Sequence, residues 1–295
     1  MRTRLLLLPA ILFACSSNTN SDDAGTDASS QNDVQSNDVV TSDAGTDSPS
    51  GDAGCGPWKY CEDFESYSAG AIKNGSMLGP WKATVQGTGI VFQVDATNPY
   101  KSKQSLHVTV PSNAGMDAGT TARGTLNQAA TGGLVTGNNV YGRAMVFYSN
   151  TGGNDLPLGV HSWLFQSAGF SSEGDGGVTM NMGSGGATAK PQLNYHPPAP
   201  LTEQSVQGGA ITAGAWHCVQ WQYDGSGSQS NVTDVAHVWI DGTAVVDVAK
   251  SKGWWFATPW NTFDFGFTHF QALANGVDVY LDDFALDGAM IPCPQ

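Results

Sequence analysis

Basic residues and long apolar runs are scarce in this chain. Its 295 residues contain 12 Lys and Arg against 26 Asp and Glu, a formal net charge of −14. Because nucleic acids and anionic membrane surfaces repel negative charge, this excess of acid makes both poor partners. The apolar run near the start, Leu5 to Phe13, falls far below the roughly 20 residues that a spanning helix needs. We therefore expect no nucleic acid partner and no transmembrane helix.

Several enzyme signatures are also missing from the sequence. It contains no Gly-x-Ser-x-Gly, no His-Glu-x-x-His, no P-loop and no dinucleotide-binding glycine pattern. Serine hydrolase, zinc protease and nucleotide chemistry therefore have no support. Acidic pairs occur only in turns or in the two acidic motifs considered below for calcium, and none has the arrangement of a glycosidase pair on one strand face. Hydrolysis is disfavoured for the same reason.

Residues 1–14 have the pattern of a bacterial lipoprotein signal peptide. Arg2 and Arg4 give the charged start, a short apolar segment follows, and the sequence Leu-Phe-Ala precedes Cys15. This pattern predicts cleavage and lipidation of Cys15, which would anchor the protein in a bacterial cell envelope. Ser16 after the cysteine favours the outer membrane or cell surface. The alternative is an ordinary secretory signal with a free cysteine.

Residues 15–54 predict a disordered linker. From residue 16 onward this segment holds eight Asp, no Lys, no Arg and no aromatic residue, and it repeats the sequence Asp-Ala-Gly-Thr-Asp. Such a composition cannot bury enough apolar surface to offset its conformational entropy. A solvated spacer behind the anchor is the favoured interpretation, and a cation-binding acidic run is the alternative.

Residues 55–295 predict one all-β domain that acts as a monomer. This part holds 18 acids and 10 bases, a net charge of −8, and its length suits a sandwich or barrel. Its four cysteines are Cys55, Cys61, Cys218 and Cys293. An even number in an exported protein predicts two disulfides. Of the three possible pairings we favour Cys55 with Cys61 and Cys218 with Cys293, because the first pair is close in sequence and the second would fix the C-terminus to a strand.

Alternating apolar and polar residues dominate this domain, and no segment has a sustained helical period. The predicted strands are 106–110, 142–148, 161–166, 217–223, 237–241, 262–270 and 277–286. Gly-, Ser- and Ala-rich stretches at 111–139, 149–160, 168–189 and 196–214 predict long loops. Asp241-Gly242 and Asn275-Gly276 are typical of hairpin turns. The pattern predicts an antiparallel jelly-roll sandwich of the concanavalin A-like or lyase-like kind.

An ordered set of short motifs resembles a known family. The motifs are Glu62-Asp63-Phe64-Glu65-Ser66, the run 100–108, the run 214–221, Phe265-Gly266-Phe267, and Leu281-Asp282-Asp283-Phe284 before Cys293. Together, over residues 58–293, they resemble the cellulose-induced secreted fungal proteins and their bacterial relatives. That family is similar to glucuronan lyases and, more distantly, to calcium-bearing carbohydrate-binding modules. The resemblance implies a jelly roll that meets polysaccharide.

The resemblance also implies a structural calcium ion. Its ligands would be Glu65 on the first strand, Ser102 in the next loop and Asp283 on the last strand. Asp283 is in phase with Val279 and Leu281, so we expect one carboxylate on an apolar face, where an unpaired charge is costly. Calcium uses hard oxygen ligands of this kind. In the alternative, Asp282 and Asp283 only accept hydrogen bonds from turn amides.

Two functions remain, and the first is polysaccharide binding. Aromatic residues on an open sheet face would stack on sugar rings, and amide side chains beside them would bind hydroxyls. The predicted substrate-binding residues are Trp163, Asn194, Trp221, Trp255, His269 and Gln271. Aromatic residues that alternate along strands more often pack in the core than bind sugars. Trp255 is the exception, because it lies in a loop-like stretch where burial in the core is a weaker explanation.

The second function is a polysaccharide lyase that cleaves a uronic-acid polymer by β-elimination. That reaction needs a group that neutralises the carboxylate, a base for the C5 proton and an acid for the leaving oxygen. His161 is the predicted base, Tyr195 the acid, and Arg143 or Gln166 the carboxylate partner. We expect His161 and Arg143 on one concave sheet. Phe270 replaces the tyrosine of the fungal pattern, which speaks against catalysis, so binding is the favoured function.

Overall fold

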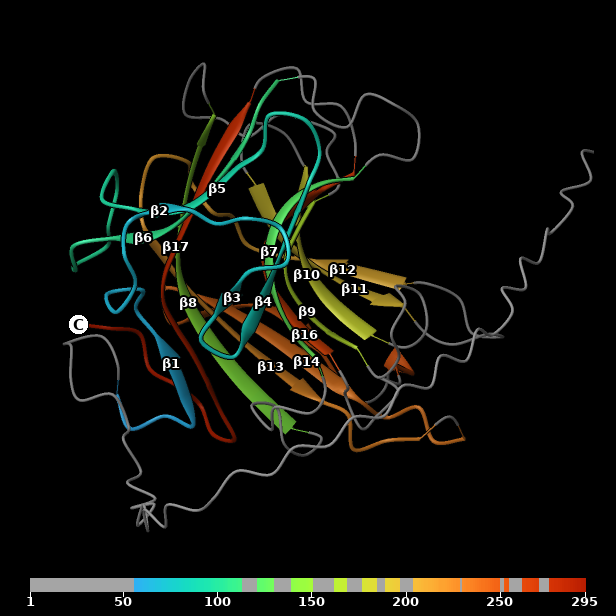
Figure 1. The fold of residues 1–295 in the computed structure, drawn as a ribbon. Coiled ribbons are helices and arrows are strands. Elements are labelled where there is room, and N and C mark those ends of the chain that lie inside the picture. Colours follow the sequence, from blue (N-terminus) through green and yellow to red (C-terminus); the bar gives the residue numbers. More distant parts are fainter. Residues whose placement is uncertain are drawn as a thin grey trace, which may run out of the picture. The chain divides into compact units, whose positions relative to one another are not determined.

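The computed structural model describes residues 56–112, 121–129, 139–150, 162–168, 177–184, 189–196, 204–228, 230–249, 252–254, 262–270 and 276–295. These residues form two antiparallel sheets packed as a sandwich (Figure 1), which confirms the predicted fold class. No helix in these ranges is long and apolar enough to cross a membrane. The predicted signal peptide, linker and Cys15 lie outside the described residues.

One sheet has nine strands in the described part of the chain. Eight follow the order β15-β14-β13-β8-β17-β6-β5-β2, and β1 pairs with one end of β17. The strands are β1 (Tyr60–Glu62), β2 (Gly70–Ala71), β5 (Val91–Asp95), β6 (Ser105–Val110), β8 (Asn139–Asn150), β13 (His217–Asp224), β14 (Val235–Ile240), β15 (Thr243–Val248) and β17 (Val277–Asp287). The last strand therefore lies in the middle of this sheet.

The other sheet has eight described strands in the order β12-β11-β10-β9-β16-β7-β4-β3. They are β3 (Met77–Leu78), β4 (Trp81–Gln86), β7 (Ala122–Ala129), β9 (Ser162–Ala168), β10 (Gly177–Ser184), β11 (Ala189–His196), β12 (Gln204–Gln207) and β16 (Thr262–His269). Since β16 and β17 belong to different sheets, the expectation of a hairpin at Asn275-Gly276 is wrong. The hairpin at Asp241-Gly242 is confirmed, because both residues have positive φ and join β14 to β15.

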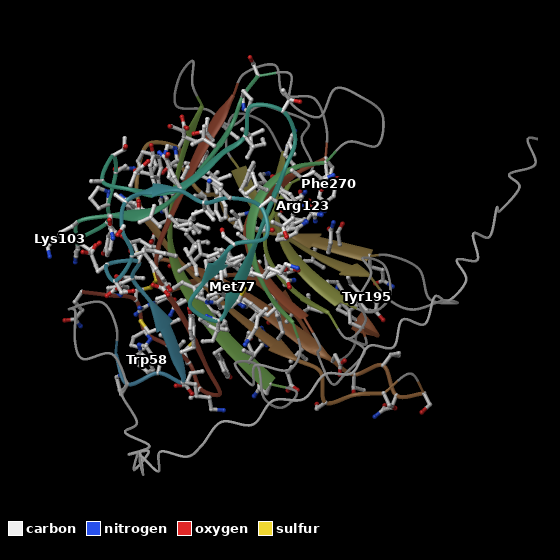
Figure 2. All side chains as sticks on the ribbon, viewed as in Figure 1. Trp58, Met77, Lys103, Arg123, Tyr195 and Phe270 are labelled. Atoms are coloured by element: carbon white, nitrogen blue, oxygen red, sulfur yellow. A yellow bond between two sulfur atoms is a disulfide. The ribbon has the colours of Figure 1, made fainter. Side chains whose placement is uncertain are left out.

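Aromatic side chains fill the space between the sheets (Figure 2). Phe284 of β17 is central to this core. It stacks on Phe265 of β16, with ring centroids 4.1 Å apart, and meets Trp81 of β4 edge to face at 5.8 Å. Buried rings of this size contribute much of the apolar area that stabilises a sandwich. The two sheets are thus joined around the strand that also carries Asp282 and Asp283.

Three stretches that the sequence predicts as loops contain strands. The structure places β7 within 111–139, β10 within 168–189 and β12 within 196–214. All three belong to the eight-stranded sheet. Their polar and small residues hide the alternation that identifies a half-buried strand, and the correction matters because this sheet carries the site described below.

The disulfide between Cys218 and Cys293 is present as predicted. It ties the C-terminal segment to β13, and two hydrogen bonds hold that segment against the same sheet. Gln220 donates to the carbonyl of Ile291 at 2.6 Å, and Arg143 donates to that of Pro292 at 3.1 Å. Cys61 is also disulfide-bonded. Its predicted partner, Cys55, lies outside the described residues.

Candidate functional site

A bulge in β9 decides which of its residues face outward. Phe165 stacks on Trp221 of the other sheet, with centroids 4.1 Å apart, so its ring faces the interior. The pairing of β9 with β10 skips Leu164, which puts Trp163 on the outer face. Trp163 and Phe165 therefore lie on opposite faces, although strict alternation would place them on the same face, because an extra residue reverses the alternation. His161 itself lies outside the described residues.

A row of polar residues crosses the eight-stranded sheet at one register. Each member pairs with the next on the adjacent strand: Lys82, Asn127, Asp264, Gln166, Thr179, Asn194 and Ser205. Neighbouring strands lie about 4.8 Å apart, so the six steps span roughly 29 Å. The row is long enough to follow an extended polymer rather than a single small molecule.

Amide side chains form a chain of hydrogen bonds at one end of this row. The Nε2 of Gln207 donates to Gln192 Oε1 at 2.9 Å, and the Nε2 of Gln192 donates to Asn194 Oδ1 at 2.8 Å. Gln207 is exposed, Gln192 is half-buried and Asn194 is buried. Asn194, a predicted binding residue, is thus the buried end of a hydrogen-bonded chain of three amides, and Gln207 is its exposed end.

Charge is divided unequally between the sheets. The strands of the eight-stranded sheet carry three basic residues, Lys82, Arg123 and Lys190, and one acid, Asp264. The strands of the nine-stranded sheet carry one base, Arg143, and eight acids, namely Glu62, Asp95, Asp224, Asp247, Asp278, Asp282, Asp283 and Asp287. An acidic chain thus has a locally basic sheet, and net charge alone does not reveal it.

Asp264 is the single carboxylate on the strands of the basic sheet, and the sequence analysis missed it. It alternates with Phe263 and Phe265, whose rings lie in the core, so its half-buried side chain is on the outer face. Burial raises the pKa of Asp264 to about 6, although a hydrogen bond from Asn127 and the charge of Arg123 oppose the shift. The sequence signal that could have identified Asp264 is a charged residue between two phenylalanines of a predicted strand.

The structure corrects two of the predicted catalytic positions. Tyr195 (labelled in Figure 2) is buried and stacks on Trp254, with centroids 5.0 Å apart, so its hydroxyl does not lie on the outer face with Asn194. Arg143 belongs to β8 of the nine-stranded sheet, where it donates to the carbonyls of Asp283 and Pro292. It is therefore not on the sheet that contains β9, the strand predicted to carry His161. Gln166 does occupy the polar row, paired with Asp264.

Trp163 and Trp221, which the sequence predicts as sugar-binding residues, do not form an aromatic platform. Trp221 is fully buried under Phe165, and Trp163 is 4% exposed on the outer face. Covered rings cannot stack on a sugar, so the assignment of Trp221 as a binding residue is wrong. His269 is buried at the end of β16 and stacks on Phe267, a core residue. Trp255 and Gln271 lie outside the described residues.

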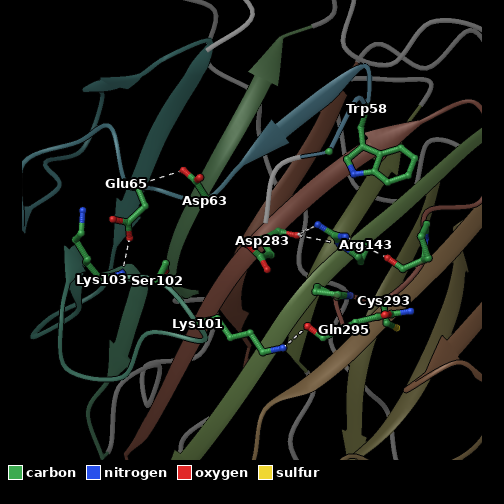
Figure 3. Close-up of a pocket in the computed structure, with 13 residues that line it drawn as sticks. Trp58, Asp63, Glu65, Lys101, Ser102, Lys103, Arg143, Asp283, Cys293 and Gln295 are labelled. Carbon is green, nitrogen blue, oxygen red and sulfur yellow. Dashed lines mark hydrogen bonds between the residues drawn. The ribbon is translucent and has the colours of Figure 1, made fainter. Parts of the chain in front are cut away.

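The three predicted calcium ligands line one pocket of about 540 Å³ (Figure 3), remote from the polar row. Glu65, Ser102 and Asp283 share its wall with Asp63 and the segment 292–295. Glu65 Oε1 accepts backbone hydrogen bonds from residues 103 and 104 at 2.8 and 2.9 Å. Within the described ranges, no three His, Cys, Asp or Glu side chains are grouped closely enough to hold a metal ion.

A second bulge turns Asp283 toward this pocket. The pairing of β17 with β8 shifts between Asp282 and Ala285, and Asp283 has a φ of 47°. Phe284 consequently points into the core and Asp283 into the pocket, so the expectation that Asp283 lies on the apolar face is wrong. Burial raises the pKa of Asp283, and the Arg143 charge opposes this shift.

The two acids of this bulge have different partners. Asp282 Oδ2 accepts hydrogen bonds from the Tyr100 amide at 3.0 Å and the Ser102 hydroxyl at 3.2 Å. For Asp282 this agrees with the alternative to calcium binding, in which the carboxylate accepts hydrogen bonds from turn amides. The Asp283 side chain accepts no hydrogen bond from the described residues. The pocket that it lines contains the oxygen-bearing side chains of Asp63, Glu65 and Ser102, and also the cations Lys101, Lys103 and Arg143.

Comparisons with known proteins support the fold. No family model matches the chain, and no curated protein matches it. Among solved structures, the cellulose-induced protein Cip1 aligns with a TM-score of 0.55 and 14% identity, over 79% of this chain and 99% of that protein. An endo-β-1,4-glucuronan lyase from the fungus Trichoderma reesei aligns with a TM-score of 0.52 and 14% identity, over 79% and 96% of the two chains. The chain thus shares the fold of these two proteins, and the resemblance predicted from its motifs is confirmed at that level.

Proposed function

We propose that this chain binds an acidic polysaccharide along the outer face of its eight-stranded sheet. The observation that carries the proposal is the concentration of basic residues on the strands of that sheet: Lys82 belongs to the polar row, and Arg123 and Lys190 lie on strands that the row crosses. Cations attract the carboxylates of a uronic-acid polymer, and amides and hydroxyls bind sugar hydroxyls. An extended row fits a polymer better than a compact ligand.

The test is binding of a soluble uronic-acid polymer and of a neutral glucan at two salt concentrations. Lys82→Gln, Arg123→Gln and Lys190→Gln together should weaken binding of the acidic polymer by roughly threefold to a hundredfold, since each exposed ion pair contributes about 0.2–1 kcal/mol. The matched control replaces Lys73 and Lys252, which lie off this sheet, and should leave affinity unchanged. Equal affinity for the neutral glucan, without salt dependence, would contradict the proposal.

Cleavage of the same polymer by β-elimination is the second candidate. Arg123 supports it, because a cation on the binding face can neutralise the uronate carboxylate and so acidify the C5 proton. With Tyr195 and Arg143 excluded by their positions, His161 and Gln166 remain the predicted catalytic residues. Ultraviolet absorbance of the unsaturated product decides the question. Loss of that absorbance in His161→Ala, with affinity retained, would establish the lyase; binding without product would establish the binding module.

Calcium in the pocket of Asp63, Glu65, Ser102 and Asp283 is a further part of the proposal. Its support is the buried Asp283 carboxylate, for which a cation would offset the cost of burial. Asp63 and Glu65 lie just after β1 and not on it. The ion would join this segment to Asp283 on β17, in the middle of the nine-stranded sheet, and stabilise the fold. Attachment of the protein to the cell envelope through Cys15 remains a proposal that rests on the sequence alone.

A further inference from the structure

Asp264 has surroundings unlike those of the other acids in the strands. It occupies the middle of the polar row, on the sheet whose other charged strand residues are Lys82, Arg123 and Lys190. A fixed negative charge there would repel the acidic polymer that the basic residues attract. Either the acid weakens the site, or its charge is removed when the polymer binds.

We propose that Asp264 is the specificity-determining residue of this face: it takes up one proton when an acidic polysaccharide binds and then donates its O–H to a carboxylate of the ligand. This inference rests on the proposed function. It goes further by naming the residue that favours a uronate over a neutral sugar. Protonated Asp264 offers a donor to an anionic oxygen, whereas ionised Asp264 offers only acceptors.

The geometry leaves one carboxyl oxygen for the ligand. Asn127 Nδ2 donates to Asp264 Oδ1, and no other hydrogen bond reaches this carboxyl group from the described residues. Because the amide fixes Oδ1, Oδ2 is the oxygen that can carry the proton toward the ligand. The half-buried position makes two adjacent ionised carboxylates costly, and sharing a proton between them is the usual resolution.

Burial makes Asp264 easier to protonate than an ordinary aspartate. It raises the pKa of Asp264 to about 6, although the hydrogen bond from Asn127 and the charge of Arg123 oppose the shift. A ligand carboxylate would raise the pKa further, and binding at neutral pH would then draw close to one proton from the buffer.

Few other groups near Asp264 titrate in this range. On the β7 side, the basic residues are Arg123 and, one strand farther on β4, Lys82. On the other side, β9 contains no titratable residue. Beyond β9, the titratable residues on the strands are Lys190, Tyr195 and His196, all on β11, and β16 itself carries His269. A pH effect that persists without Asp264 would therefore point to histidine.

The experiment measures proton uptake by calorimetry, with an oligoglucuronate as the probe and the full chain in buffers of different ionisation enthalpy at pH 7. The wild type should take up close to one proton per site and bind up to tenfold tighter for each unit that the pH falls between 8 and 6. Asp264→Asn should take up none and should bind with an affinity that hardly changes over this range. Asp247→Asn, an acid of the other sheet, is the matched control and should behave as the wild type.

Each outcome separates the two proposals. Binding of the oligoglucuronate without proton uptake, or an unchanged pH slope in Asp264→Asn, overturns the role of Asp264 and leaves the binding face intact. Absence of binding in the wild type overturns the proposed function and this inference with it. Since proton uptake is measured on the wild type, a variant that fails to fold does not prevent the test.

Discussion

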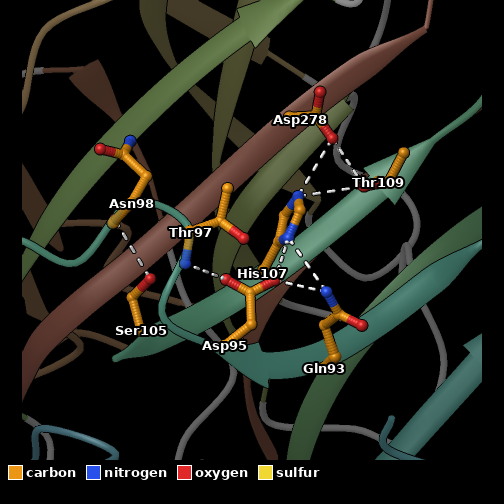
Figure 4. Close-up of polar contacts among 8 residues, drawn as sticks. All are labelled: Gln93, Asp95, Thr97, Asn98, Ser105, His107, Thr109 and Asp278. Atoms are coloured by element: carbon orange, nitrogen blue, oxygen red, sulfur yellow. Dashed lines mark hydrogen bonds and ion pairs between the residues drawn. The ribbon is translucent and has the colours of Figure 1, made fainter. Parts of the chain in front are cut away.

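His107 joins three strands of the nine-stranded sheet through two carboxylates (Figure 4). Its Nδ1 lies 2.6 Å from Asp95 Oδ2 on β5, and its Nε2 lies 3.0 Å from Asp278 Oδ1 on β17. The ring is stacked on Tyr280, with centroids 4.0 Å apart. Both contacts are hydrogen bonds only when the imidazole is protonated, because the neutral ring has one donor. The stability of the domain should therefore depend on the charge of His107.

The direction of this dependence follows from the pKa shifts. Burial alone would lower the pKa of His107, but its bonds to Asp278 and Asp95 outweigh burial and raise it above the ordinary value. The pKa values of both carboxylates are lowered, despite their own burial, through their bonds to His107. The stabilisation is thus complete between about pH 4 and pH 6.5. It is lost as pH rises through the folded pKa of His107, and also as pH falls through those of the two acids.

The magnitude can be estimated from the contacts. Each hydrogen bond to a charged group contributes about 1.5–3 kcal/mol. The estimate must be reduced because Asp95 keeps a bond from the Thr97 amide and Asp278 keeps one from the Thr109 hydroxyl. We expect His107→Gln to lower the free energy of unfolding by about 2 kcal/mol at pH 6, and by much less at pH 8.5.

Urea denaturation of the wild type and His107→Gln between pH 5 and pH 9, at constant ionic strength, measures this difference. His237→Gln is the matched control, since His237 contacts Asp247, whose side chain is 71% exposed; the control should have little effect at any pH. A difference between wild type and His107→Gln that stays constant from pH 6 to pH 8.5 would refute the reasoning, because it would show that packing rather than charge sets the contribution.

Three further predictions follow from other parts of the chain. Asp283→Asn should abolish the rise in melting temperature that added calcium gives the wild type, since a metal bound only by the folded state stabilises it; an unchanged melting curve in chelator would remove the calcium proposal. Replacing both Cys218 and Cys293 by serine opens a link with a sequence separation of 75 residues and should cost up to about 4 kcal/mol in unfolding experiments, by loop-closure entropy. Cys15→Ser should move the protein from the membrane to the soluble fraction of an expressing bacterium.

The sequence predicts the strands of the core better than three strands that carry the polar row. Strands such as β13, with buried Val219 and Trp221, alternate clearly and are confirmed. The missed strands β7, β10 and β12 place Asn127, Thr179 and Ser205 in the polar row. A strand that carries polar residues for a ligand loses part of the apolar signal by which strands are recognised. The same property that suits these strands to binding conceals them in the sequence.

Bulges account for the misplaced site residues. In β9 and β17, strict alternation predicts which face of the sheet each side chain occupies. The extra residue, Leu164 in β9 or Asp283 in β17, moves the side chains beyond it to the opposite face. A bulge in a strand depends on its partner strands, which a single sequence does not identify. The pairing of Cys218 with Cys293 was predictable, because the cysteine count left few alternatives.

The two proposed sites belong to different sheets, and this separation makes their roles distinguishable. The pocket of Asp283 and Arg143 lies against β17 and β8 of the nine-stranded sheet, whereas Asp264 and Arg123 lie on β16 and β7 of the other. A calcium ion in the pocket would not touch a polymer on the polar row, so its effect on binding could come only through the stability of the fold. At a temperature where the chelated protein remains folded, affinity for the oligoglucuronate should therefore equal that of the calcium-loaded protein. A large loss of affinity in folded, chelated protein would instead mean that the metal belongs to the binding face, and the division of roles between the sheets would be wrong.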